Sequence, residues 1–167
     1  PGPEAPDDAA LREAFDALKT RVFELMGECA INKALEEIWA YLNQVNKYLA
    51  DRAPWKIAKD PAQKPRLARI LGQATAAVRG IAYLLYPVMP GTADKVWGYL
   101  GETGRLRDVR WADLAFAGWD PKREVGEPRP LFPRTALKDF LGDAPAAPAP
   151  AQAAPPAPPG KWSRQSR

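Results

Sequence analysis

The sequence contains no histidine and a single cysteine, Cys29, among its 167 residues. Histidine is the usual general acid or base near neutral pH and the commonest metal ligand, so its absence excludes His-containing catalytic triads and most zinc sites. The lone cysteine cannot form an internal disulfide, which favours a reducing, cytoplasmic setting. We therefore expect this chain to bind no metal or cofactor of its own.

Long apolar runs are also missing from the sequence. No segment approaches the roughly 20 apolar residues that a membrane-spanning helix needs, and the first ten residues are acidic and proline-rich, unlike a secretory signal peptide. The phosphate-binding patterns GxGxxG and GxxxxGK[ST] do not occur. Glu36 and Glu37 are adjacent and diverge on a helix, which favours a solvated face over acid–base chemistry. The sequence thus indicates neither a membrane partner nor a catalytic centre.

Apolar residues recur at the spacing of an amphipathic helix through most of the first hundred residues. This pattern predicts helices over about residues 8–26, 29–50, 65–86 and 91–100. The residues expected on their buried faces are Leu11, Phe15, Leu18, Val22, Leu25, Ile31, Leu35, Ile38, Leu42, Val45, Leu49, Leu67, Ile70, Leu71, Ala74, Val78, Ile81, Leu84, Leu85, Ala93, Val96, Trp97 and Leu100, with Trp39 also at core spacing. Three long helices and a short one, joined by brief loops, predict an all-α antiparallel helical bundle.

The helical periodicity fades after residue 101. The apolar residues expected to cover the open end of the bundle are Trp111, Leu114, Phe116 and Trp119. From residue 143 the chain is mostly alanine and proline, ending in a basic stretch, a composition that cannot form a packed core. We therefore expect a helical domain over residues 1–142 and a disordered tail over residues 143–167.

Positive charge is concentrated in one part of the chain. The overall formal charge is only +4, but residues 51–80 contain seven basic and two acidic residues, a local charge of +5. Within this region the predicted connector 51–64 contains Trp55 after Pro54, with Lys56 and Lys59 following. A tryptophan among lysines can stack on a nucleobase while the lysines neutralise phosphates. The alternative is a buried tryptophan that anchors the loop to the bundle.

Two further polar residues lie in this connector or close to it. Arg52 adds to its positive charge, and Asn46 lies close to the end of the preceding helix. Asn46 could hydrogen-bond the connector backbone and hold Trp55 in place; the alternative is an exposed polar side chain without a structural role. The candidate RNA-binding residues are Trp55, Pro54, Asn46, Lys56, Lys59 and Arg52.

The stretch from Asn32 to Lys59 closely resembles the anticodon-binding domain of methionyl-tRNA synthetases. The matching segments, in chain order, are KALEEIW at 33–39, NKY at 46–48, APWK at 53–56, YPVMP at 86–90 and PLFPR at 130–134. Together they extend over about 110 residues in the order that the family shows. The resemblance implies the helical bundle of class I synthetase anticodon-binding domains.

The resemblance also implies a function. The family attaches methionine to its initiator and elongator tRNAs, using ATP with Mg²⁺, and its helical domain recognises the CAU anticodon. By this resemblance Trp55 stacks on an anticodon base and Pro54 contributes to the same surface. The implied partners are the anticodon loop of methionine tRNA and the catalytic domain of the parent synthetase.

The chain also departs from the family pattern. The catalytic domain, with its HIGH and KMSKS motifs, is absent, and so is an earlier helix on which the family uses an asparagine and an arginine, four residues apart, to recognise the anticodon. We therefore expect this chain to be a C-terminal piece of a longer ligase that holds part of the anticodon site. We also expect it to be a monomer. The alternatives are the anticodon-binding domain of another class I synthetase, or a free-standing helical interaction module with a proline-rich tail.

Overall fold

The computed structural model describes residues 6–116, 124–127 and 129–133, and every structural statement below concerns these residues. The helices are α1 (Pro6–Gly27), α2 (Ile31–Arg52), α3 (Pro54–Ile57), η1 (Pro61–Gln63), α4 (Lys64–Leu85), α5 (Pro90–Tyr99), η2 (Leu106–Asp108) and η3 (Trp111–Asp113). The described part of the chain contains no strand. The prediction of an all-α fold with three long helices and a shorter fourth is confirmed, each boundary agreeing within about two residues.

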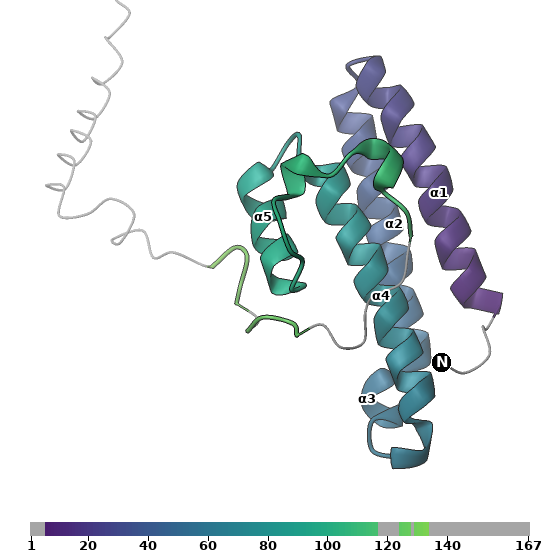
Figure 1. The fold of residues 1–167 in the computed structure, drawn as a ribbon. Helices are drawn as coiled ribbons and strands as arrows, with labels where there is room; N and C mark the ends of the chain where they lie inside the picture. Colours follow the sequence, from purple (N-terminus) through teal and green to yellow (C-terminus); the bar gives the residue numbers. More distant parts are fainter. Residues whose placement is uncertain (1–5, 117–123, 128, 134–167) are drawn as a thin grey trace, which may run out of the picture. The chain divides into compact units, whose positions relative to one another are not determined.

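The three long helices form an antiparallel bundle (Figure 1). Helix α1 packs against α2 and α4, α2 packs against α4, and α5 packs against α4. The single-turn helix α3 and η1 lie at one end of the bundle, where α2 ends and α4 begins. None of the described helices is both long and apolar enough to cross a lipid bilayer.

Helix α1 buries the stripe that its sequence predicts. All five predicted core residues of this helix are buried, and the Phe15 side chain is completely inaccessible. The Phe15 ring lies 5.8 Å from the ring of Tyr41 on α2 and 5.6 Å from that of Phe116, measured between centroids. Phe15 therefore lies at the centre of the core, where α1, α2 and the segment that follows α5 meet.

Helix α2 is rotated relative to the prediction. Its buried residues are Ala34, Ile38, Tyr41, Val45 and Tyr48, whereas Ile31 and Trp39 are 48% and 43% exposed. The expectation that Trp39 is a core residue is wrong, and so is that for Leu71 on α4, which is 42% exposed. Tyrosines can occupy the buried stripe because their hydroxyl groups find acceptors: Tyr41 Oη donates to the Leu11 carbonyl at 3.1 Å.

The segment after α5 lies along the side of the bundle, not over its open end. Gly101 adopts a left-handed φ of 68°, which ends the helical region. The ring centroid of Trp111 then lies 5.4 Å from that of Phe23 on α1 and 6.0 Å from that of Tyr83 on α4. Leu114 is buried, and its carbonyl accepts a hydrogen bond from Lys19 Nζ at 2.7 Å. The segment therefore bridges α1 and α4.

Two predictions fall outside the described residues. Trp119 belongs to the segment 117–123, and the predicted tail, residues 143–167, follows the last described residue. The chain divides into a compact unit, Pro1–Leu131, and a second unit, Phe132–Arg167, of which only residues 132 and 133 are described.

Candidate nucleic-acid interface

The connector between α2 and α4 begins with a sharp change of backbone direction. Ala53 has the left-handed angles φ 43° and ψ 59°, and its N–H donates to the Leu49 carbonyl at 2.9 Å, which closes α2. Pro54 follows as the first residue of α3, a position where its missing N–H costs no helical hydrogen bond. The predicted end of the second helix, at about residue 50, thus lies two residues later, at Arg52. Residues 51–64 are nevertheless largely helical, because α2 extends to Arg52 and α3 and η1 fill the connector.

Helix α3 is anchored by one face and exposes the other. Pro54 and Ile57 are three residues apart, so they lie on the same side of a single helical turn, and both are buried. Trp55 lies between them in sequence and on the opposite side, with 59% of its surface exposed. The alternative of a buried Trp55 is therefore wrong. Trp55 is thus exposed to solvent on a helical turn that Pro54 and Ile57 anchor to the bundle.

Backbone hydrogen bonds fix the shape of the turn that carries Trp55. The amide of Lys56 donates to the Ala53 carbonyl at 2.8 Å, and the amide of Ala58 donates to the Pro54 carbonyl at 2.9 Å. The amide of Lys59 donates to the Lys56 carbonyl at 3.3 Å. Lys56 directly follows Trp55, Lys59 lies one helical turn further along, and both lysines are exposed. One exposed tryptophan and two exposed lysines therefore share a short, internally hydrogen-bonded loop.

Asp60 closes the connector on its other side. Its carboxylate accepts hydrogen bonds from the Ala62 amide at 2.9 Å and from Gln63 Nε2 at 3.0 Å. These bonds favour the ionised carboxylate, the Gln63 bond most, and hold the pKa of Asp60 below its ordinary value. Asp60 therefore acts as the N-terminal cap of η1, which leads directly into α4.

Arg52 and Asn46 do not join this exposed group in the way the sequence suggests. The Arg52 guanidinium is half-buried and lies 5.4 Å from the centre of the Tyr48 ring, a cation–π contact. Asn46 is exposed on α2, about two turns before Ala53. Of the two alternatives for Asn46, its exposure favours a polar side chain without a structural role. Contact of either residue with RNA stays a prediction.

The structure contains a buried polar cluster near the connector that the sequence did not predict. Asp8, in the first turn of α1, is 1% exposed, and its carboxylate accepts a hydrogen bond from Tyr48 Oη at 2.6 Å. Arg69 Nη1, on α4, lies 3.8 Å from the other Asp8 oxygen. Asp8 lies in the first turn of a helix, where an acidic residue favours the positive end of the helix dipole and is more often exposed. Its position three residues before Leu11 places it on the buried stripe, and that periodicity could have indicated its burial.

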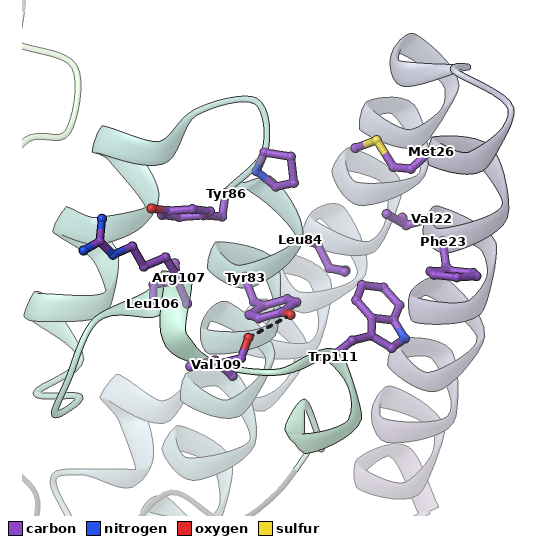
Figure 2. A pocket seen from close by; sticks show the side chains of 11 residues that line it. Val22, Phe23, Met26, Tyr83, Leu84, Tyr86, Leu106, Arg107, Val109 and Trp111 are labelled. Atoms are coloured by element: carbon purple, nitrogen blue, oxygen red, sulfur yellow. Dashed lines mark hydrogen bonds between the residues drawn. The ribbon is translucent and has the colours of Figure 1, made fainter.

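An apolar pocket of about 250 Å³ lies at the other end of α4 (Figure 2). It is formed by α1, the C-terminal end of α4 and the segment from η2 to η3, and the Tyr83 hydroxyl beside it donates to the Val109 carbonyl at 3.1 Å. Its lining is almost entirely apolar, apart from Arg107 and two tyrosine hydroxyls. In the described ranges, no group of three or more acidic or cysteine side chains is arranged to hold a metal ion. The connector is therefore the better candidate for a polyanionic ligand.

Comparisons with known proteins identify the family. Residues 1–120 match the model of the anticodon binding domain of methionyl tRNA ligase. The chain is 41% identical over 107 residues to the methionine–tRNA ligase of Streptomyces coelicolor, covering 60% of this chain and 20% of that protein. It is 29% identical over 134 residues to that of Fusobacterium nucleatum, covering 80% and 21%.

Solved structures agree with this assignment. Mycobacterium tuberculosis methionyl-tRNA synthetase in its free state superimposes with a TM-score of 0.73 at 33% identity, over 81% of this chain and 27% of that one. The chain thus spans about a fifth of the length of the curated relatives it matches. The match is to the methionine-specific family, which decides against the anticodon-binding domain of another class I synthetase. The chain belongs to the family of anticodon-binding domains of methionyl-tRNA ligases.

Proposed function

We propose that this chain binds the anticodon loop of methionine tRNA through the α3 connector, as part of a methionine–tRNA ligase. The observation that carries the proposal is the exposure of Trp55 in a chain of this family. Tryptophan is largely buried in most folded proteins, as Trp97 is here at 4% exposure. An indole that is 59% exposed on an anchored helical turn is well suited to pack against something outside the chain.

A nucleobase suits the exposed indole because every base has an apolar π-face. Stacking of one base on one aromatic side chain is worth roughly 1–3 kcal/mol. The turn that carries Trp55 is already fixed by Pro54, Ile57 and its backbone hydrogen bonds. Little conformational entropy of the backbone is then lost on binding, so more of the stacking energy contributes to affinity.

The two lysines supply the complementary charge. Lys56 and Lys59 are exposed and close to Trp55 in the chain, so their ammonium groups can reach the phosphates on either side of a stacked base. Lys64 and Arg66 are also exposed and extend the positive surface onto the start of α4. The positive field of this end of the bundle would also attract the RNA before contact.

Within the whole ligase, the chain would act at a distance from the chemistry. The proposed partner domain holds the ATP and Mg²⁺ that activate methionine, and this chain supplies binding energy and specificity. Binding of the anticodon fixes the orientation of the tRNA. The acceptor end then loses less entropy when it binds at the active site. We further propose that the protein acts as a monomer in the cytoplasm.

The test is the affinity of the chain for a methionine tRNA anticodon stem-loop with and without Trp55. Trp55→Ala is expected to weaken binding by the roughly 1–3 kcal/mol of one stacking contact, with no change in melting temperature. Trp39→Ala is the matched control, because Trp39 is also exposed but lies on α2 away from the connector. Binding by Trp55→Ala that equals that of the unchanged chain, with both variants folded, would sink the proposal.

A further inference from the structure

We propose that Asp8 is a positioning residue for Trp55, because its buried carboxylate ties together the two helix ends that the connector joins. The inference rests on the proposed function for its biological meaning, since Trp55 matters only if it stacks on RNA. Its physical content concerns the geometry of the connector and can be tested without RNA.

The Asp8 cluster lies one to two turns from both ends of the connector. Tyr48 lies on α2, five residues before Ala53, where α2 ends. Arg69 lies on α4, five residues after Lys64, where α4 begins. Asp8 belongs to neither helix but contacts both, with a 2.6 Å hydrogen bond from Tyr48 and a 3.8 Å ion pair with Arg69. A side chain of α1 therefore holds the spacing between the end of α2 and the start of α4.

The connector depends on that spacing because its own hydrogen bonds define the shape of its turn but not where the turn lies on the bundle. Helix α3 has only four residues, and a helix of one turn is not stable alone in water. Its buried anchors are Pro54 and Ile57, and it packs against α4. Any change in the distance between α2 and α4 must alter how Pro54 and Ile57 fit, and with them the direction of the Trp55 ring.

Burial makes the Asp8 cluster a strong constraint. The Asp8 side chain is 2% exposed and the Arg69 side chain 20%, so removing one partner leaves a charge poorly solvated. Arg69 Nε is also buried and has no hydrogen-bond partner among the described residues. The constraint extends to the connector itself, because Arg52, the residue before Ala53, lies over the Tyr48 ring.

The decisive comparison is Tyr48→Phe against Tyr41→Phe. Each change removes one buried hydroxyl that joins α2 to α1, through Asp8 in one case and through the Leu11 carbonyl in the other. Tyr41 lies seven residues, about two helical turns, farther from the connector. The two variants lose the same kind of atom at the same helix pair, so only their position relative to the connector and the charge of their partner differ.

Amide hydrogen exchange of the connector is the first measurement. We expect the amides of Lys56, Ala58 and Lys59, which close the α3 turn, to exchange faster in Tyr48→Phe by on the order of tenfold. They should exchange at the original rate in Tyr41→Phe. Asp8→Asn, which keeps an oxygen acceptor for Tyr48 but removes the charge facing Arg69, should open the same amides.

RNA affinity is the second measurement. Affinity for the methionine tRNA anticodon stem-loop should fall on the order of fivefold in Tyr48→Phe and stay unchanged in Tyr41→Phe. The positioning role is overturned if the connector amides exchange at the same rate in Tyr48→Phe and Tyr41→Phe. It is also overturned if Tyr48→Phe accelerates the exchange of all amides of the chain equally. Faster connector exchange in Tyr48→Phe together with unchanged RNA binding by Trp55→Ala would instead leave the positioning role intact and refute the proposed function.

Discussion

The ring of Phe15 on α1 lies directly against the backbone of Gly80 on α4. A Cβ atom at Gly80 would overlap two carbon atoms of that ring. Gly80 is buried, and Phe15 is the largest of the fully buried side chains among the described residues. The absence of a side chain at position 80 is thus what allows α1 and α4 to approach each other at the centre of the bundle.

This contact predicts opposite effects for two glycines of the same helix. Gly80→Ala should destabilise the fold by about 1–3 kcal/mol, because the Phe15 ring must leave its position to admit the methyl group. Gly72→Ala should stabilise it by about 0.5–1 kcal/mol, because nothing lies within 4 Å of a Cβ there and alanine favours the helix. Urea unfolding of both variants measures the two free energies. A stabilising Gly80→Ala would contradict the packing of Phe15.

The α1 stripe was predictable from sequence because its core residues are aliphatic or phenylalanine at regular spacing. Helix α2 was less predictable, because its buried face includes Tyr41 and Tyr48, whose burial depends on acceptors in α1. The aliphatic residues alone predict a buried face that is shifted part of a turn around the helix and includes Ile31, which is 48% exposed. Information on the partner helix is needed to correct that shift.

The candidate site was predictable in its location but not in its geometry. The basic composition and the proline-flanked tryptophan single out the connector from sequence alone. Whether Trp55 is buried or exposed depends on a single helical turn, and one turn is too short to show a periodicity. The Asp8 cluster joins three helices that are distant in sequence, so no local pattern indicates that Tyr48 and Arg69 are the partners of Asp8.

The left-handed backbone at Ala53 predicts an unusual response to glycine. An L-amino acid is strained at φ 43°, by roughly 1–2 kcal/mol. Glycine, which has no Cβ, removes that strain but makes the unfolded chain more flexible. Ala58 has ordinary right-handed angles, φ −59° and ψ −20°. Glycine at position 58 therefore relieves no strain and only makes the unfolded chain more flexible, which lowers stability. Ala53→Gly should therefore be more stable than Ala58→Gly by about 1 kcal/mol in urea unfolding. Equal stabilities would contradict the left-handed assignment.

Burial of Tyr41 predicts a loss of stability at alkaline pH. Desolvation, assisted by the nearby Asp16, raises the pKa of Tyr41 above its ordinary value of 10.0. The folded chain then keeps the phenolic proton after the unfolded chain has lost it. The contribution of Tyr41 is thus fully present below pH 10 and falls as the pH rises toward the folded pKa.

Comparison with Tyr41→Phe isolates this effect. The unchanged chain should be more stable than the variant at neutral pH, by about 1 kcal/mol for the hydrogen bond to Leu11. That difference should shrink as the pH rises above 10, because only the unchanged chain has this phenol to ionise. Unfolding curves over this pH range give the result, and a difference that stays constant with pH would argue against burial of the hydroxyl.

The two connector lysines should determine the salt dependence of RNA binding. Each phosphate that a lysine neutralises in a single-stranded region contributes about 0.7 to the slope of log affinity against log salt concentration. Lys56→Gln with Lys59→Gln should therefore lower the magnitude of this slope by up to about 1.4. Lys33→Gln with Lys95→Gln removes the same charge from two exposed positions on α2 and α5 and should leave the slope nearly unchanged.

Comparison of the two pairs separates phosphate contact from general attraction. Long-range attraction depends on net charge, which both pairs lower by two, so it would reduce affinity similarly in both. Direct contact at the connector lowers the slope only for Lys56 and Lys59. Equal slopes for the two double variants would mean that neither Lys56 nor Lys59 contacts a phosphate. Stacking on Trp55 would then have to bind the RNA without help from these two lysines.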